Sequence, residues 1–378
     1  MNTEQLVARV LDPDWLSEQA GRPVRAARLR IKSRTSLVVG LDDTAGHPAG
    51  WLRILWPISR NKAARTRREA GELGLETAEH ELGELLVQTG PLPADPKLLT
   101  RIAAATASGK LGRWEASQVL RYNPLRRVVV RDGMRVVRVA TSRDRGVAFD
   151  RFVAGVVETP LRLDDGTLDG ISVHAFTGAL DLADLLDGNP PEVDREPVHG
   201  TSDPVRAAGA MLAQLHAAEI PGDLARSLAA RTADPVAQGL AHAALLDELA
   251  PDLAEQMRRV VARLPGAASA MPVLSHGDLS PDQVLTTHAG DTVWLTDFDR
   301  ACLAPRAVDL GSFLAVLDDA TFLDGYRDGG GQVPPEDQLR RAVAVSLILR
   351  AADPLRRASC DWKQQVSANL DRIMEVAT

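Results

Sequence analysis

The chain has little of what would place it outside the cytoplasm, in a membrane or on nucleic acid. Its two cysteines, Cys302 and Cys360, fall in different segments without metal-ligand spacing, which predicts free thiols in a reducing compartment. It has no run of eighteen apolar residues, and its first residues do not combine a basic segment with an apolar one. A basic excess is also lacking, because the net charge is -7. We therefore expect a cytoplasmic protein that binds neither membranes nor nucleic acid.

Lysine is also scarce. It occurs only at Lys32, Lys62, Lys97, Lys110 and Lys363, whereas arginine is abundant and alanine runs are frequent. This bias is typical of a GC-rich coding sequence and indicates an actinobacterial type of source. Where a site needs a cationic side chain, we therefore expect arginine more often than lysine.

The composition is that of an ordinary globular protein, with 45% hydrophobic and 25% charged residues. A length of 378 residues suits two or three packed units. We expect boundaries near residues 108 and 177, which give units 1–108, 109–177 and 178–378. The last unit has mainly helical patterning, whereas the first two contain strand patterns.

The first unit predicts strands followed by a helix. The segments VRAARLRIKSRTSLVVGL and GWLRILWP have strand patterning on either side of a polar turn. Residues 61–86 are rich in Arg and Glu, and we predict them to be mostly helical. The cluster TGPLPADPKLL breaks this pattern and marks the end of the unit.

The stretch 274–314 carries the chemistry. It reads LSHGDLSPDQVL, then a strand pattern VWLTDFD, then AVDLGSFL. A polar turn thus presents Asp278, an amide follows at Gln283, and Asp297 lies at the end of the strand. Phosphoryl transfer needs a group that orients the acceptor hydroxyl and oxygens that fix the bridging magnesium. The stretch therefore predicts a kinase.

These motifs resemble those of the aminoglycoside phosphotransferase and choline-kinase-like families. The resemblance implies an α+β, two-lobed protein-kinase-like fold, with a small β-rich lobe at 109–177 and a large helical lobe from 178. The unit 1–108 would be an N-terminal α+β cap. By the same resemblance Asp278 is the catalytic Asp, and Gln283 and Asp297 are metal ligands. His276 and Asp309 would support the catalytic loop.

The nucleotide site is expected in the small lobe. SQVLRYNPLRRVVVRDGMRVVRVA predicts a hairpin that turns at Asp132-Gly133. In the family the second strand carries a phosphate-binding Lys, and here Arg138 takes that position. Asp150 on the next helix would be its partner or be exposed. Val173 and Ala175 would lie in the hinge, whose backbone groups meet the adenine.

The resemblance implies ATP or GTP with Mg²⁺ as cofactors and a small hydroxylated acceptor, either an antibiotic or a sugar. Asp318, Asp319, Asp324 and Asp328 are consistent with a cationic acceptor, and they are equally consistent with solvated loops. Two other functions stay open. One is a scaffold that has lost turnover and binds a protein partner, and the other acts on Ser or Thr of a biosynthetic peptide.

Overall fold

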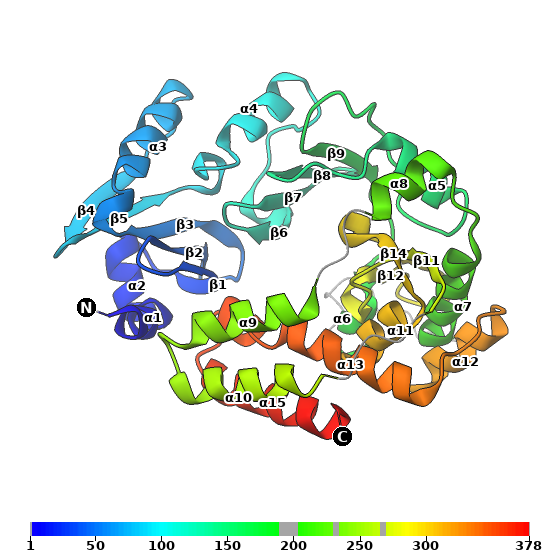
Figure 1. Cartoon of the computed structure of the whole chain (residues 1–378). Coiled ribbons are helices and arrows are strands. Elements are labelled where there is room, and N and C mark those ends of the chain that lie inside the picture. The colour runs from blue at the N-terminus through cyan, green and yellow to red at the C-terminus, as the bar shows by residue number, and fades with distance from the viewer. Residues whose placement is uncertain (1, 189–202, 230–233, 265–269, 378) are drawn as a thin grey trace.

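The structure is a computed structural model that describes residues 2–188, 203–229, 234–264 and 270–377. Two antiparallel sheets occupy the first half of the chain, and a mainly helical second half follows them (Figure 1). The expected α+β class is confirmed.

The N-terminal unit has a five-stranded sheet of order β1-β2-β3-β5-β4. Its elements in chain order are α1 (Thr3–Leu11), α2 (Pro13–Ala20), β1 (Arg25–Lys32), β2 (Ser36–Asp42), β3 (Pro48–Leu55), α3 (Asn61–Glu72), β4 (Ala78–Leu82), β5 (Leu85–Gly90) and α4 (Leu99–Ala107). The strand patterns expected on either side of the polar turn are β1, β2 and β3.

The helix expected over 61–86 is wrong beyond Glu72, where α3 ends. Gly74 follows with φ at +69°, and the chain then forms the β4–β5 hairpin. Val87 of β5 is fully buried opposite Ile54 of β3. Pairing with β3 therefore outweighs the helix propensity of the Glu, Leu and Ala residues in this segment.

The small sheet has the order β6-β7-β8-β9. Its elements are β6 (Val119–Asn123), β7 (Arg127–Asp132), β8 (Arg135–Ala140), α5 (Val147–Ala154) and β9 (Ile171–Ala175). The predicted hairpin is confirmed, with its turn one residue later than expected: Asp132 pairs with Arg135, so Gly133 and Met134 form the turn, and Gly133 has φ at +64°. Such a positive φ in a two-residue turn matches the twist of the flanking strands.

The second half supplies the remaining helices and short strands. These are β10 (Leu180–Asp181), α6 (Leu182–Leu186), α7 (Pro204–Ala217), α8 (Gly222–Ala229), α9 (Pro235–Leu246), α10 (Pro251–Ala262), β11 (Pro272–Ser275), β12 (Val284–Thr286), β13 (Val293–Leu295), β14 (Cys302–Pro305), α11 (Ala307–Leu314), α12 (Ala320–Asp328), α13 (Glu336–Arg350), α14 (Asp353–Arg356) and α15 (Trp362–Ala377).

Asp-Pro pairs begin several of these helices. Asp203 accepts hydrogen bonds from the backbone N–H groups of Val205 and Arg206 at the start of α7, and Asp234 accepts one from Val236 at the start of α9. In each case the next residue is a proline, whose fixed φ suits the first helical position. The sequence thus sets where the helices of the large lobe begin.

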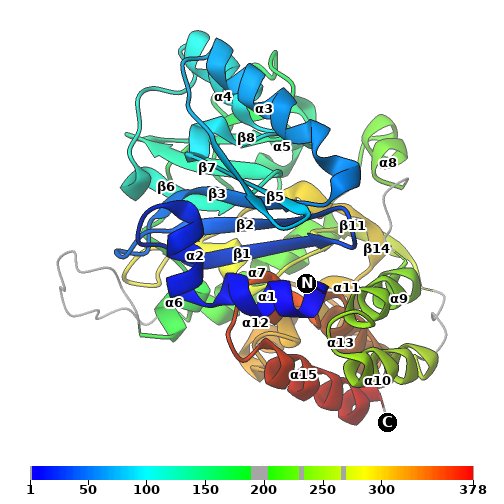
Figure 2. The same cartoon turned by 90° about the vertical axis from the view of Figure 1, so that its left-hand side faces the viewer.

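The N-terminal unit is joined to the rest of the chain through two hydrophobic clusters. Leu6 and Leu52 share one core with Leu246 of α9 and Ile373 of α15. These two helices lie on the same side of the molecule as α1 and β1 (Figure 2). Trp51 belongs to a second core, together with Val137 of the small sheet. A third core surrounds the stretch 274–314 and includes residues of α7, α11 and α12. The N-terminal unit therefore bridges the small sheet and the C-terminal helices.

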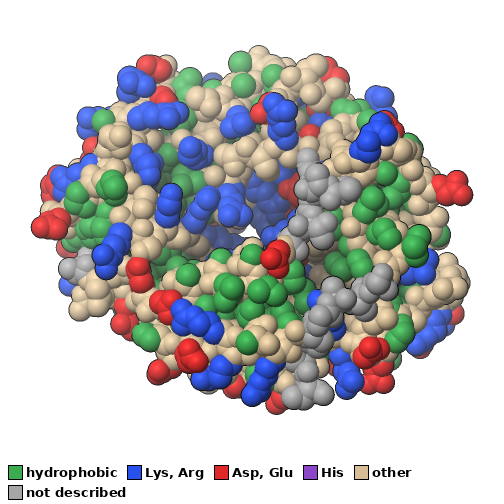
Figure 3. Space-filling model, viewed as in Figure 1, with side chains coloured by type: hydrophobic (Ala, Val, Ile, Leu, Met, Phe, Trp, Pro, Cys, Tyr) green, Lys and Arg blue, Asp and Glu red, His purple; other side chains and the backbone are tan. Residues whose placement is uncertain are grey.

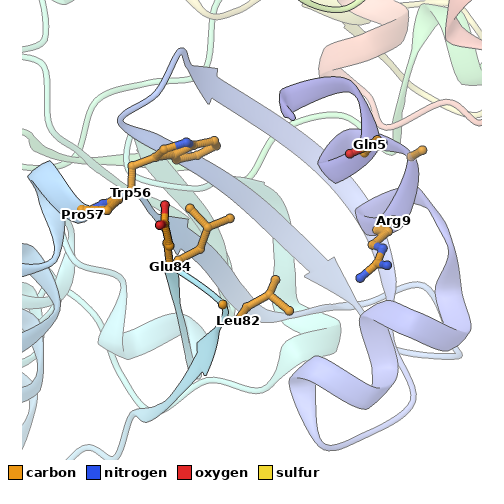
Figure 4. A pocket seen from close by; sticks show the side chains of 9 residues that line it. Gln5, Arg9, Trp56, Pro57, Leu82 and Glu84 are labelled. Carbon is orange, nitrogen blue, oxygen red and sulfur yellow. The ribbon is translucent and has the colours of Figure 1, made fainter. Parts of the chain in front are cut away.

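Two hollows lie on different parts of the molecule. One, of about 650 Å³, opens between α1 and the β4–β5 hairpin, where Arg9, Trp56 and Glu84 line it (Figure 4). The other lies at the centre of the face shown in Figure 3, where Lys and Arg side chains gather around it. Among the described residues, no helix is long and apolar enough to cross a membrane.

Candidate active site

One buried carboxylate holds the loop that carries His276, Gly277 and Asp278. Asp309 of α11 is fully buried and accepts hydrogen bonds from the backbone N–H groups of His276 and Gly277, each at 2.7 Å. It also accepts one from Nε2 of His216, at 3.0 Å, and Nδ1 of His216 contacts the hydroxyl of Tyr326 at 2.8 Å. Burial alone would raise the pKa of Asp309, but the contacts with His216 and the N–H of Gly277 outweigh it and lower that pKa. Asp309 is therefore an ionised structural anchor.

His276 is oriented by the backbone. Its Nε2 lies 2.8 Å from the carbonyl of Thr296, and because a carbonyl can only accept, Nε2 carries the proton. The ring is fully buried against Phe298, with 4.7 Å between the ring centroids. This environment suits an orienting residue better than a general base.

Gly277 lets two loops meet closely. Its φ is +81°, and a Cβ there would lie 2.2 Å from the carbonyl oxygen of Arg300. A larger residue would force the turn that carries Asp278 away from the turn that carries Asp297.

Asp278 stands at the open end of this loop. Its side chain is one-third exposed, and its carboxylate lies 3.5 Å from a nitrogen of Arg300 and 3.2 Å from Nη2 of Arg350. Arg350, in the last turn of α13, is itself held by Ser346 at 2.9 Å and Ser312 at 3.2 Å. A cavity of about 90 Å³ between α11 and α13 reaches Asp278 and Arg350. An acceptor hydroxyl in this cavity could reach the carboxylate.

Asp297 has an unusual backbone. It follows β13 by two residues and adopts the left-handed region, with φ at +61° and ψ at +50°. Arg127 of β7 donates to both of its oxygens, at 3.1 and 2.9 Å. Burial raises the pKa of Asp297, but the charge and hydrogen bonds of Arg127 outweigh it, and the pKa is lowered. Strain of this kind persists where the surroundings fix it, often at functional sites.

Arg127 faces Asp297 and Asp299 and interacts electrostatically with Asp278, and the region around these side chains is hereafter called the cleft. Arg138 reaches it from β8. Its Nη2 donates to Asp299, while Nε and Nη1 are buried and have no hydrogen-bond partner among the described residues. The proposed Arg138–Asp150 pair is wrong. Asp150 instead pairs with Arg162 at 2.7 Å, and Asp144 and Asp164 hold the same guanidinium. Arg138 pairs with Asp299 and not with Asp150 because β7 and β8 face the turn that carries Asp297 and Asp299.

Gln283 lies beside the Asp297 turn. It is buried, and its carbonyl accepts the N–H of Thr296 at 3.0 Å, one residue before Asp297. Its side-chain Nε2 donates to Asp282 at 3.3 Å. The pairing of β12 with β13 therefore brings the amide and the carboxylate to one edge.

The expected hinge groups are already bonded. The N–H of Val173 donates to Asp164 and its carbonyl accepts from Leu163, while the N–H of Ala175 donates to the carbonyl of Leu161. An adenine could use Val173 or Ala175 only after displacing this loop. The edge of β9, where we expected the adenine to bind, is thus covered by the loop of Leu161 and Leu163.

The four acidic residues expected near the acceptor do not line the cavity beside Asp278. Asp319 caps α12 by accepting the N–H of Thr321, Asp324 pairs with Arg327 at 2.7 Å, and Asp328 pairs with Arg206 at 2.5 Å. These contacts favour the alternative of solvated surface acids.

Three residues of the cleft were missed from the sequence. Asp299 is the second Asp of the DFD motif, which offered a visible signal. Arg127 lies in an Arg-rich strand, where nothing distinguishes it from its neighbours. Arg350 comes from a helix more than seventy residues after Asp278, and no local motif marks it.

A small antiparallel-sheet lobe, a larger helical lobe and carboxylates on two facing loops define a two-lobed, protein-kinase-like phosphotransferase fold. The chain belongs to the phosphotransferase enzyme family, whose family model matches residues 106–343. This match begins after most of the N-terminal unit, covers the small lobe and most of the large lobe, and ends within α13.

A solved structure shares the fold. A choline/ethanolamine kinase family protein from Mesorhizobium loti has 17% identity, covers 74% of this chain and 94% of its own, and gives a TM-score of 0.50. A macrolide 2'-phosphotransferase from Brachybacterium faecium has 22% identity, with coverage of 75% and 98% and a TM-score of 0.43. Among curated proteins, no sequence matches this chain.

Proposed function

We propose that this protein transfers the γ-phosphoryl group of ATP or GTP to a hydroxyl of a small molecule. The observation that carries this proposal is that Arg127 links the three groups: it pairs with Asp297 and Asp299, Asp299 also pairs with Arg138, and the charge of Asp278 acts on Arg127. Family membership supports the same reaction class. Three groups of the types that phosphoryl transfer requires are therefore placed together.

Asp278 is the residue that orients the acceptor. Its carboxylate lies at the mouth of the cavity, where it can accept a hydrogen bond from the attacking hydroxyl and later take its proton. Arg350 and Arg300 contact this carboxylate from two sides and fix its direction. Because the transition state is loose, positioning matters more than early deprotonation.

Arg138 is the residue that receives the nucleotide phosphates. Burial of Nε and Nη1 without a partner costs free energy. A phosphate that replaced Asp299 as the partner of Nη2 could accept a second, parallel hydrogen bond from a neighbouring nitrogen of the same guanidinium. Arginine binds phosphate through two parallel N–H groups, so the absence of the family's lysine does not remove the function.

Asp297 and Gln283 would hold Mg²⁺. A carboxylate and an amide supply the oxygen ligands that this ion prefers, and Arg127 already places positive charge against Asp297. When bound there, the ion would supply positive charge against the negative charge of the nucleotide phosphates. Arg127 must then turn away from Asp297 or share it.

Calorimetric titration tests the nucleotide site. Wild type is titrated with the β,γ-imido analogue of ATP, with and without Mg²⁺, beside Asp297→Ala and the control Asp291→Ala. Asp291 is an exposed Asp at the other end of β13. We expect Mg²⁺-dependent binding that falls about tenfold or more in Asp297→Ala and persists in Asp291→Ala.

Absence of binding to wild type under every condition would contradict the proposal. The arginine pairs that close Asp278 and Asp297 would then favour the scaffold alternative, in which those carboxylates only stabilise the fold.

A further inference from the structure

The cleft beside Asp278 holds more arginines than its carboxylates can pair. Each Asp that faces the cleft already has an arginine partner. These pairs are Asp278 with Arg300 and Arg350, Asp282 with Arg121, Asp297 with Arg127, Asp299 with Arg138, and Asp353 with Arg356. Within the described part of the chain, Arg28, Arg126 and Arg357 form no ion pair. These three residues are hereafter the arginine cluster.

Three parts of the fold bring the arginine cluster together. Arg28 belongs to β1, which lies against α14, and Arg357 caps the C-terminus of α14. A Cβ placed on Gly40 of β2 would lie 3.3 Å from both the Arg28 Cβ and Pro124, so β1 also meets the β6–β7 turn. Arg126 is in that turn. The N-terminal unit thus completes the cleft with a charge that neither lobe supplies.

The electrostatic neighbours of these residues agree with this placement. Burial and the charges of Arg121 and Arg357 lower the pKa of Arg28, and they outweigh the charge of Asp353, which raises it. Burial and the charges of Arg30, Arg356 and Arg300 lower the pKa of Arg126. Because Arg300 also pairs with Asp278, the positive region extends from β1 to the catalytic carboxylate. Basic side chains accordingly surround the central hollow (Figure 3).

Like charges held together destabilise the folded protein unless an anion offsets them. The protein as a whole has a net charge of -7, so this concentration of positive charge is local. A cationic acceptor would be repelled here, and the surface acids near α12 pair elsewhere.

We propose, as an extension of the function proposed above, that the acceptor carries a phosphate or carboxylate group, which the arginine cluster binds while Asp278 orients its hydroxyl. The substrate class is then an anionic hydroxy compound, such as a sugar phosphate or a sugar acid. Its negative group would bridge the N-terminal unit and the two lobes, which gives that unit a role in substrate selection.

Inorganic phosphate is the simplest probe of the cluster. Wild type, saturated with Mg²⁺ and the β,γ-imido analogue of ATP, is titrated with phosphate, with chloride at matched ionic strength as the salt control. The test variant is the double substitution Arg28→Gln and Arg357→Gln. Arg68→Gln removes one exposed arginine of α3 and serves as control. We expect phosphate binding that falls about tenfold or more in the double variant and persists in Arg68→Gln.

Glucose and glucose 6-phosphate, which differ only in the phosphate, test the acceptor class in the same complex. We expect the phosphate ester to bind wild type about tenfold or more tightly than glucose, and this preference to vanish in the double variant. Equal binding of the two compounds, or a preference that survives in the variant, would overturn the proposal.

Two further readouts separate the possible failures. If the double variant loses affinity for the nucleotide analogue by a similar factor, the cluster serves the nucleotide's phosphates, and its assignment to the acceptor is wrong. If wild type binds no nucleotide, the proposed function fails, and titration of phosphate without nucleotide still tests the cluster. Loss of that binding in the double variant would support an anion site, whereas no phosphate binding to wild type would exclude it.

Thermal unfolding shows whether the variant is folded. Removing two repelling charges should raise the unfolding temperature of the double variant in chloride, and phosphate should stabilise wild type more than the variant. A variant stabilised by phosphate as much as wild type would contradict the proposal.

Discussion

The two antiparallel sheets each bury an arginine, but they treat it differently. Arg53 of β3 donates to Gln88 at 2.8 Å, to the Lys62 carbonyl at 2.7 Å and to Thr66 at 2.8 Å. Burial lowers its pKa to about 10. Arg138 of β8 donates to one carboxylate, and two of its nitrogens have no partner among the described residues. The first arginine is satisfied by the fold, whereas the second keeps donors for a ligand.

The same contrast separates the N-terminal sheet from the cleft as a whole. In the N-terminal sheet Gln88 is fully buried and bonds Arg53, Ala63 and Glu79, so its polar groups form a closed network. In the cleft the polar groups form ion pairs that a charged substrate can exchange. A buried network stabilises a structure, whereas exchangeable ion pairs leave the charged groups of a binding site able to change partner.

The largest expected effect is a loss of phosphoryl transfer that leaves the stability of the fold unchanged. Asp278→Asn should reduce phosphoryl transfer about 10³-fold, because the amide cannot accept the hydroxyl proton. The unfolding temperature should stay nearly constant, since the side chain is one-third exposed. Coupled detection of nucleoside diphosphate release and calorimetric unfolding measure the two quantities. Turnover close to that of wild type would show that Asp278 is not the catalytic carboxylate.

The reverse experiment breaks the N-terminal network. Arg53→Met should lower the free energy of unfolding by about 3 kcal/mol, because Gln88 and Thr66 lose their buried partner. Arg25→Met, which removes an exposed arginine from the same sheet, should cost about 0.5 kcal/mol or less. Urea denaturation compares the two variants. Similar losses in both would mean that burial of Arg53 contributes little.

The matching change in the small sheet should behave in the opposite way. Arg138→Met should weaken binding of the nucleotide analogue about tenfold or more, because charge-assisted hydrogen bonds to phosphate are lost. Its cost in stability should be small, because Arg127 also lies 3.5 Å from Asp299. Calorimetry and urea denaturation on Arg53→Met and Arg138→Met complete the comparison. Unchanged affinity in Arg138→Met would remove Arg138 from the nucleotide site.

The sequence was sufficient for the parts of the site that local motifs encode. Asp278 and Asp297 stand in short, ordered patterns whose chemistry is legible, and the β7–β8 turn follows from Asp132-Gly133. The family, the α+β class and the two-lobed fold could be inferred from these patterns alone.

What the sequence could not predict depends on pairing across long separations. For Asp150 the sequence left open a pair with Arg138 or exposure, and neither expectation included Arg162, which reaches Asp150 from a loop after the helix that no periodicity reveals. The β4–β5 hairpin was read as helix because only contact with β3 selects the strand. The arginine cluster joins residues more than three hundred positions apart, so no window of sequence contains it.

The smallest expected effect concerns stability in acid. Two buried carboxylates, Asp309 and Asp95, have pKa shifts of opposite sign and should change the free energy of unfolding in opposite directions. The pKa of Asp309 is lowered, so the unfolded state binds its proton more tightly, and Asp309 stabilises the fold above about pH 4 and loses that contribution as the pH falls. The pKa of Asp95 is raised, chiefly by burial, against hydrogen bonds from Leu125, Lys97 and Tyr122. Its folded state therefore binds the proton more tightly, and stability falls as the pH rises above about 4.

The opposite pKa shifts of Asp309 and Asp95 predict that each carboxylate changes the unfolding free energy over a different pH range. Asp309→Asn should flatten the rise in stability below about pH 4, where the wild-type carboxylate loses its proton earlier in the folded state than in the unfolded state. Asp95→Asn should leave that window unchanged and remove a decline in stability above about pH 4. Urea denaturation at pH values from about 2 to 6 measures both slopes. Changes in the same window for both variants would mean that His216 and the loop N–H groups do not offset the burial of Asp309.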